Sequence, residues 1–147
     1  MPVLVSREGV PESPIGSRAL RRRAERMLCV LGRADAELSI LLCGDREIHR
    51  LNRRYRKKNK PTDVLAFPLA EGPPVTGQLL LGDVVISLET AGRQAERHAH
   101  SLWAEVTTLL AHGLLHLVGY DHRDDEEERE MNAKTRELAR AATSRPA

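Results

Sequence analysis

The chain has 147 residues, of which 41% are hydrophobic and 30% are charged, and its formal net charge is +2. This length predicts a single domain over residues 1–147, large enough to bury about two thirds of the surface that the unfolded chain exposes. No apolar run approaches the roughly 20 residues of a membrane span, and the N-terminus lacks a secretory signal, so we expect a cytoplasmic protein rather than a membrane or secreted one.

Hydrophobic periodicity predicts helices and strands that interleave irregularly along the chain. In chain order it predicts a strand over 3–5, a helix over about 18–32, a strand over 37–44, a helix from 45, a strand over 63–68, a loop over 71–77, a strand over 79–87, a helix after Ser87, a helix over about 101–118 and a last helix from about 124 to 142. This order predicts an α+β fold in which a small mixed sheet packs against helices.

Small polar residues and the cysteines add local predictions. Ser17 and Asp45 each precede an apolar helical pattern, so we predict that their side chains cap the two helices. Gly32 is the predicted stop of the first of these helices. Cys29 and Cys43 lie in apolar surroundings without metal-site spacing, which predicts reduced thiols buried in the core.

Residues 50–60, called here the basic segment, hold seven Lys and Arg residues without one acid. The first 60 residues carry 15 basic and 7 acidic side chains, whereas residues 61–147 carry 8 and 14. Cations at a helix C-terminus complement the helix dipole, and this explains two or three of the seven. The remainder indicate phosphate binding, because arginine and lysine neutralise phosphate oxygens. The predicted contacts are Arg53, Arg54, Lys57, Lys58 and Lys60.

The stretch from His112 to His122 reads His-Gly-Leu-Leu-His-Leu-Val-Gly-Tyr-Asp-His. On a helix, His112 and His116 project from one face about 6 Å apart, a spacing that suits two ligands of one cation. Gly119 lets the chain leave the helix, because glycine tolerates the positive φ of a helix C-terminus. His122 then returns as a third ligand. Three neutral nitrogens leave a fourth position open, which predicts one catalytic Zn²⁺ per chain.

The same spacing occurs in metzincin proteases, but the glutamate that serves there as the general base is Gly113 in this chain. Peptide hydrolysis by that route is therefore disfavoured. Asp121 adjoins His122 and is a candidate to orient an imidazole or to take up a proton.

Other potential ligands are assigned plainer roles. His49, His98 and His100 are interpreted as surface residues. Glu105 lies seven residues before His112, hence on the same helical face but about 10 Å along the axis, which argues against its binding the same ion.

The histidine motif resembles the signature of the YbeY family of metal-dependent bacterial endoribonucleases, which are rRNA maturation factors. Residues 51–68, with Lys60-Pro-Thr-Asp-Val-Leu-Ala-Phe-Pro68 at their end, resemble the family's Arg-containing T-D-V-L-S-F-P block. Residues 81–87 resemble its G-D-I-x-I-S strand, and Met131 and Glu137 fit its last helix. The resemblance covers about residues 48–138. The sequence departs from it in two places: Ala66 stands in place of serine, and Lys57-Lys58-Asn59 stands in place of Gly-x-Asp.

The resemblance implies an α+β fold, a zinc ion held by His112, His116 and His122, and cleavage of single-stranded RNA in 16S rRNA 3′-end maturation and ribosome quality control. It matches Arg56 to an essential arginine, which we interpret as stabilising the phosphate while zinc acts as a Lewis acid or activates water. The expected partners are an rRNA precursor and the small ribosomal subunit, with no DNA and no membrane. Two alternatives stay open: a zinc hydrolase of peptides or small molecules, and a non-catalytic ribosome-binding factor with a structural metal.

Overall fold

The computed structural model describes residues 3–68 and 80–143. Its elements are β1 (Val3–Arg7), α1 (Ser17–Val30), β2 (Glu37–Cys43), α2 (Asp45–Arg56), β3 (Val64–Pro68), β4 (Leu80–Ser87), α3 (Leu88–Arg97), α4 (Leu102–Leu117) and α5 (Asp125–Thr143). The predicted order of elements and the α+β class are confirmed, with ends that differ by one or two residues at most positions. The predicted loop over 71–77 lies outside the described residues.

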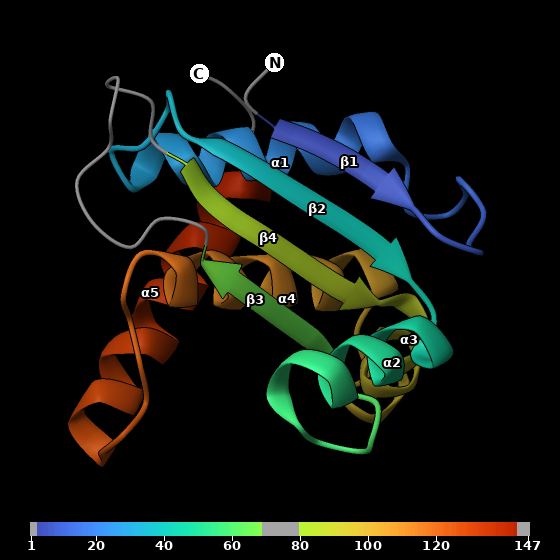
Figure 1. The fold of residues 1–147 in the computed structure, drawn as a ribbon. Helices are drawn as coiled ribbons and strands as arrows, with labels where there is room; N and C mark the ends of the chain where they lie inside the picture. Colours follow the sequence, from blue (N-terminus) through green and yellow to red (C-terminus); the bar gives the residue numbers. More distant parts are fainter. Residues whose placement is uncertain (1–2, 69–79, 144–147) are drawn as a thin grey trace.

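The four described strands form one mixed sheet in the order β1-β2-β4-β3 (Figure 1). β1 pairs with β2, and β2 with β4, in parallel, whereas β3 runs antiparallel to β4. Ile40 of β2 lies opposite Val84 of β4, so apolar side chains from neighbouring strands meet on one face. The predicted mixed sheet is confirmed.

Helices cover the two faces of the sheet unequally. α1, α4 and α5 lie behind the sheet in Figure 1 and build the larger core with side chains such as Ile40, Val84 and Leu110. On the opposite face, Ile48 of α2 packs against Leu65 and Val85 in a smaller core. Both α2 and α4 contact β3, so this edge strand lies between the end of the basic segment and the histidine helix. Among residues 3–68 and 80–143, no helix has the length and apolar composition needed to span a bilayer.

The two predicted helix caps are wrong, because both side chains bond to distant segments instead. Ser17 and Asp45 are instead the first residues of α1 and α2, and the residue before each is a glycine N-cap that makes no side-chain hydrogen bond. The hydroxyl of Ser17 accepts a hydrogen bond from Arg7 Nε at 2.9 Å. One carboxylate oxygen of Asp45 accepts from Ser87 Oγ at 2.7 Å and from Thr90 Oγ1 at 2.6 Å. Asp45 therefore ties α2 to the start of α3.

The cysteines differ from each other. Cys43 is buried at the end of β2, as predicted, and burial raises the pKa of its thiol to about 12. Cys29 is exposed, which corrects the prediction for that residue. Its side chain falls outside the buried stripe of α1, and the helix ends at Val30, before the predicted stop at Gly32.

Candidate functional site

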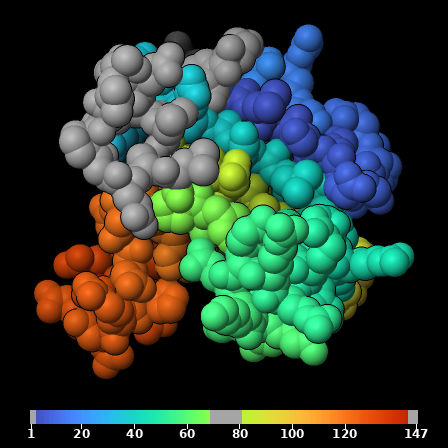
Figure 2. Space-filling model, viewed as in Figure 1, coloured from blue at the N-terminus to red at the C-terminus, as the bar shows by residue number. Residues whose placement is uncertain are grey.

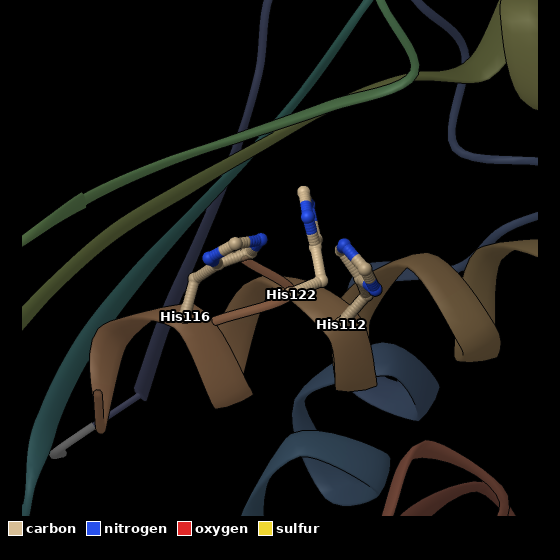
Figure 3. A group of neighbouring side chains, drawn as sticks. All are labelled: His112, His116 and His122. Atoms are coloured by element: carbon tan, nitrogen blue, oxygen red, sulfur yellow. The ribbon is translucent and has the colours of Figure 1, made fainter. Parts of the chain in front are cut away.

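The three motif histidines converge at the C-terminal end of α4 and form what we call the three-histidine cluster. The ring centroids of His112 and His116 lie 4.9 Å apart, and His122 lies 6.3 Å from the first and 5.7 Å from the second. One ligand nitrogen from each ring lies within 4.8 Å of those of the other two. Figure 3 shows the three rings on the same side of α4 around a common space. The structure thus brings together all three predicted ligands.

The turn after α4 returns His122 to the other two rings. Gly119 has φ 101°, a conformation that residues with a Cβ rarely adopt, and no heavy atom lies within 4 Å of the position a Cβ would take. Backbone conformation, rather than lack of space, therefore explains the glycine. The amide of Tyr120 donates to the carbonyl of Leu115 at 2.9 Å and closes the end of the helix.

Gly113 lies on the face of α4 that packs against the sheet. A Cβ at this position would lie 2.9 Å from Val84 Cγ1 and 3.4 Å from Val64 Cγ2, closer to Val84 than normal packing allows. A larger side chain would force α4 away from β3 and β4. The structure therefore offers no room for the glutamate that metzincin proteases carry at this position.

The surroundings of the cluster favour neutral imidazoles. Burial, and then the neighbouring His116, lower the pKa of His112, while Asp63 opposes them. Burial, and then His122, lower the pKa of His116, with a further contribution from Arg56. A neutral imidazole keeps a free lone pair for a metal ion, so protons compete less well for these two ligands. Three imidazole nitrogens without a thiolate are a donor set that zinc and similar divalent ions bind well.

Arg56, the last residue of α2, faces the same site from across β3. Its Nη2 donates a hydrogen bond to the carbonyl oxygen of Ala66, and the guanidinium lies 5.3 Å from the ring centroid of Phe67. Arg56 and His116 both border a hollow of about 490 Å³, called here the basic hollow. Its other lining residues are Asn52, Lys58, Lys60, Thr62, Val64, Leu65, Ala66 and Pro68. Figure 2 shows a cleft between the green surface of this region and the orange C-terminal half.

The other predicted basic contacts are divided between two places. Lys58 and Lys60 line the basic hollow with Arg56, whereas Arg53 and Arg54 line a separate hollow on α2. Lys57 is the C-cap of α2 and has φ 57°, so the chain turns sharply there and carries the following lysines toward β3. The basic segment therefore does not form one continuous surface around the cluster.

Asn52 was missed as a site residue by reasoning from the sequence. It is 2% exposed, and its side-chain Nδ2 donates to the backbone carbonyl oxygen of Lys60 at 2.9 Å. The backbone carbonyl oxygen of Asn52 accepts from the backbone amide of Lys58 at 3.3 Å. It thus holds the loop with both lysines against α2. The available signal was its position four residues after the buried Ile48, where an apolar residue is usual.

Two carboxylates near the cluster also bond to the backbone. Asp63 accepts from the amide of Val64 at 2.7 Å and from Gln94 Nε2 at 3.2 Å, and it was not among the predicted residues. Asp121 accepts from the backbone amide of His122 at 2.8 Å. The bond that Asp121 makes in this structure therefore orients the backbone at His122 rather than its imidazole.

Comparisons with known proteins identify a family and relatives that this chain resembles. Residues 13–143 match the family model described as Endoribonuclease YbeY. Curated relatives with the name Endoribonuclease YbeY include one from Anaeromyxobacter sp., 56% identical over 131 residues that cover 89% of this chain and 67% of the relative. Another, from Geobacter metallireducens, is 47% identical over 85% of each chain.

The fold also resembles a solved structure. A solution structure of a Thermotoga maritima protein matches with a TM-score of 0.66 and 26% sequence identity. The match covers 95% of this chain and 88% of that one.

Proposed function

The chain belongs to the YbeY family of endoribonucleases, and from this premise we propose that it is a metal-dependent endoribonuclease that cleaves single-stranded RNA in rRNA maturation. The observation that carries the proposal is that His116 and Arg56 border one hollow together with Lys58 and Lys60. This places a candidate metal site beside groups that bind phosphate, and a phosphodiester is a substrate that requires both.

His112, His116 and His122 are the residues we assign to the metal, and zinc is the ion their three nitrogens favour. A divalent ion held there supplies Lewis acidity, which stabilises negative charge on a phosphodiester. Because the three ligands are neutral, they leave the charge of such an ion undiminished.

Arg56 is the residue we assign to the phosphate. The carbonyl oxygen of Ala66 accepts a hydrogen bond from one of the five N–H donors of its guanidinium, which lies 5.3 Å from the ring centroid of Phe67. Phosphate oxygens accept hydrogen bonds from guanidinium donors of this kind, so the side chain stabilises charge that develops there during cleavage. Lys58 and Lys60 hold the RNA backbone through contacts that carry little sequence information.

We further propose that residues 1–147 act as one domain in the cytoplasm. The proposed substrate is the 3′ end of a 16S rRNA precursor on the small ribosomal subunit. The family relationship supports this placement, and the basic hollow supports a polyanionic partner. Cells depleted of the protein should accumulate 16S rRNA with unprocessed 3′ ends, whereas normal ends in such cells would contradict the proposed pathway.

The decisive experiment compares three substrates in parallel. Zinc-loaded protein is incubated with single-stranded RNA, duplex RNA and casein, and each reaction is repeated with metal-stripped protein. We expect cleavage of the single strand alone, lost on stripping and restored by zinc. Cleavage of casein without cleavage of RNA would favour the peptide-hydrolase alternative. Cleavage of no substrate, with binding to the small subunit retained, would favour the non-catalytic factor.

A further inference from the structure

A second group of potential metal ligands lies at the opposite end of α4 from the three-histidine cluster. His98 Nδ1 lies 3.1 Å from Glu105 Oε1, and His100 Nε2 lies 2.6 Å from the same oxygen. The ligand atoms of all three side chains lie within 4.8 Å of one another. These residues are called here the His–His–Glu cluster.

The chain between α3 and α4 brings the two imidazoles together. His98 is the C-cap of α3, and Ala99 follows it with φ 55°, a left-handed conformation that reverses the chain. The amide of His100 donates to the carbonyl of Ala95 at 3.1 Å and fixes this turn. As a result, the two rings lie with centroids 5.6 Å apart, and Glu105 from the first turn of α4 lies against both.

The carboxylate of the cluster is buried, whereas its two imidazole rings are partly exposed to solvent. The side chain of Glu105 is 5% exposed, whereas those of His98 and His100 are 59% and 38% exposed. A buried carboxylate requires strong compensation for the water it has lost, and two imidazole N–H groups directed at one oxygen provide part of it. A divalent cation provides more, because it neutralises the charge itself.

The rings can change from donors to ligands at little cost. When the proton of a neutral imidazole moves to its other nitrogen, the nitrogen that faces Glu105 becomes a lone-pair donor. Both rings are partly open to water, so the displaced N–H finds a hydrogen-bond partner there.

We propose that His98, His100 and Glu105 form a second divalent-metal site that binds zinc or a similar ion and links the end of α3 to the start of α4. Two imidazoles and one carboxylate are a common zinc donor set, with water completing the coordination. Bonds of about 2.0–2.2 Å place ligand atoms roughly 3–3.5 Å apart, so the pair at 3.1 Å fits and the pair at 2.6 Å opens by less than about 1 Å. Two exposed ligands make this site weaker than the three-histidine cluster. The site is separate from the proposed RNA cleavage.

The test is a titration of metal-stripped, full-length protein with Zn²⁺ alone, followed by calorimetry and by elemental analysis after gel filtration. All proteins carry Cys29→Ser, so that the exposed thiol does not bind zinc. We expect two ions per chain, in a tight and a weaker phase. His98→Gln keeps a polar side chain of similar size but loses the ligand nitrogen Nδ1, so the weaker phase should be lost or weakened at least tenfold. His116→Ala should retain the weaker phase and lose the tight one.

Controls separate this site from adventitious binding. His49→Gln removes a different, partly exposed histidine and should leave both phases unchanged; loss of the weaker phase in that variant would overturn the proposal. The second equivalent of zinc should also raise the midpoint of thermal unfolding in the parent protein but not in His98→Gln. The proposal would be overturned if the parent bound one ion per chain. It would also be overturned if His98→Gln bound two ions as tightly as the parent does. Neither result would affect RNA cleavage, for which His98→Gln should match the parent.

Discussion

The two ends of α4 carry clusters of similar side chains that are built in different ways. At the C-terminal end, the three candidate ligands fall within eleven residues, and two of them share one helical face. At the N-terminal end, the turn after α3 supplies His98 and His100 and the first turn of α4 supplies the buried Glu105. Local helical spacing thus explains the first cluster, whereas the second exists only because a chain reversal brings its members together.

The clusters also differ in charge, and this difference separates their chemistry. Three neutral imidazoles leave the charge of a bound ion undiminished, and the basic hollow that holds Arg56 adjoins them. A carboxylate ligand such as Glu105 offsets part of that charge, which suits an ion that links two helices. We therefore expect RNA chemistry at one end of α4 only.

The largest expected effect is that of His116→Ala. This change removes the ligand on which the helical pair depends, so we expect loss of the tightly bound ion and of RNA cleavage down to the level of metal-stripped protein. Elemental analysis and a cleavage assay measure both. Substitution of His98 by glutamine should leave cleavage intact, and equal loss of activity in the two variants would break the proposed division between the ends of α4.

Arg56→Ala should reduce cleavage about 10²-fold or more, because a charged donor to the transition-state phosphate is lost. Metal content should stay unchanged, since Arg56 is no ligand. Kinetics on a single-stranded RNA and elemental analysis test this expectation. The matched control is Arg22→Ala, which removes an exposed arginine of α1 and should have no effect. Full activity in Arg56→Ala would rule out the proposed role.

A smaller effect is expected from replacing Lys58 and Lys60 together by glutamine. On a single strand, log affinity falls with log salt by about 0.7 per phosphate neutralised, so the loss of two lysine contacts should flatten the slope by roughly one to two units. Binding of a labelled RNA over a range of salt concentrations measures the slope. The pair Arg53→Gln and Arg54→Gln, in the separate hollow on α2, shows how far the RNA extends. An unchanged slope in the lysine pair would exclude the basic hollow as the RNA path.

The smallest expected effect is on the pH dependence of stability, which tests the electrostatic surroundings of the three-histidine cluster. The folded protein lowers the pKa of His112 from its ordinary value of 6.5, so the unfolded chain binds more protons below that pH. In metal-free protein this contribution to stability is present above pH 6.5 and is lost as the pH falls through the lowered value. The midpoint of thermal unfolding should therefore fall more steeply between pH 7.5 and pH 5 in the parent than in His112→Gln. Parallel curves would contradict the inferred burial effect.

Much of the fold was predictable because its signals are local. The apolar run of β2 and the spacing of Leu20, Ala24 and Met27 in α1 depend only on neighbours a few residues away, and both elements form where expected. The N-cap predictions failed for the opposite reason. The partners of Asp45 lie 42 and 45 residues further along the chain, and a local sequence pattern cannot predict such hydrogen bonds.

The sequence by itself determined the three-histidine cluster, because the spacing of His112 and His116 on a helix and the positive φ of Gly119 bring the ligands together without help from distant residues. Only the tertiary structure placed Arg56 beside them, since β3 has to pass between α2 and α4 for the two to share a hollow. Tertiary structure likewise explained Gly113 through its contact with Val84, and it converted two apparent surface histidines into partners of a buried glutamate. The physical reason is that burial and close approach are properties of pairs of distant segments, whereas spacing on one helix is a property of the chain alone.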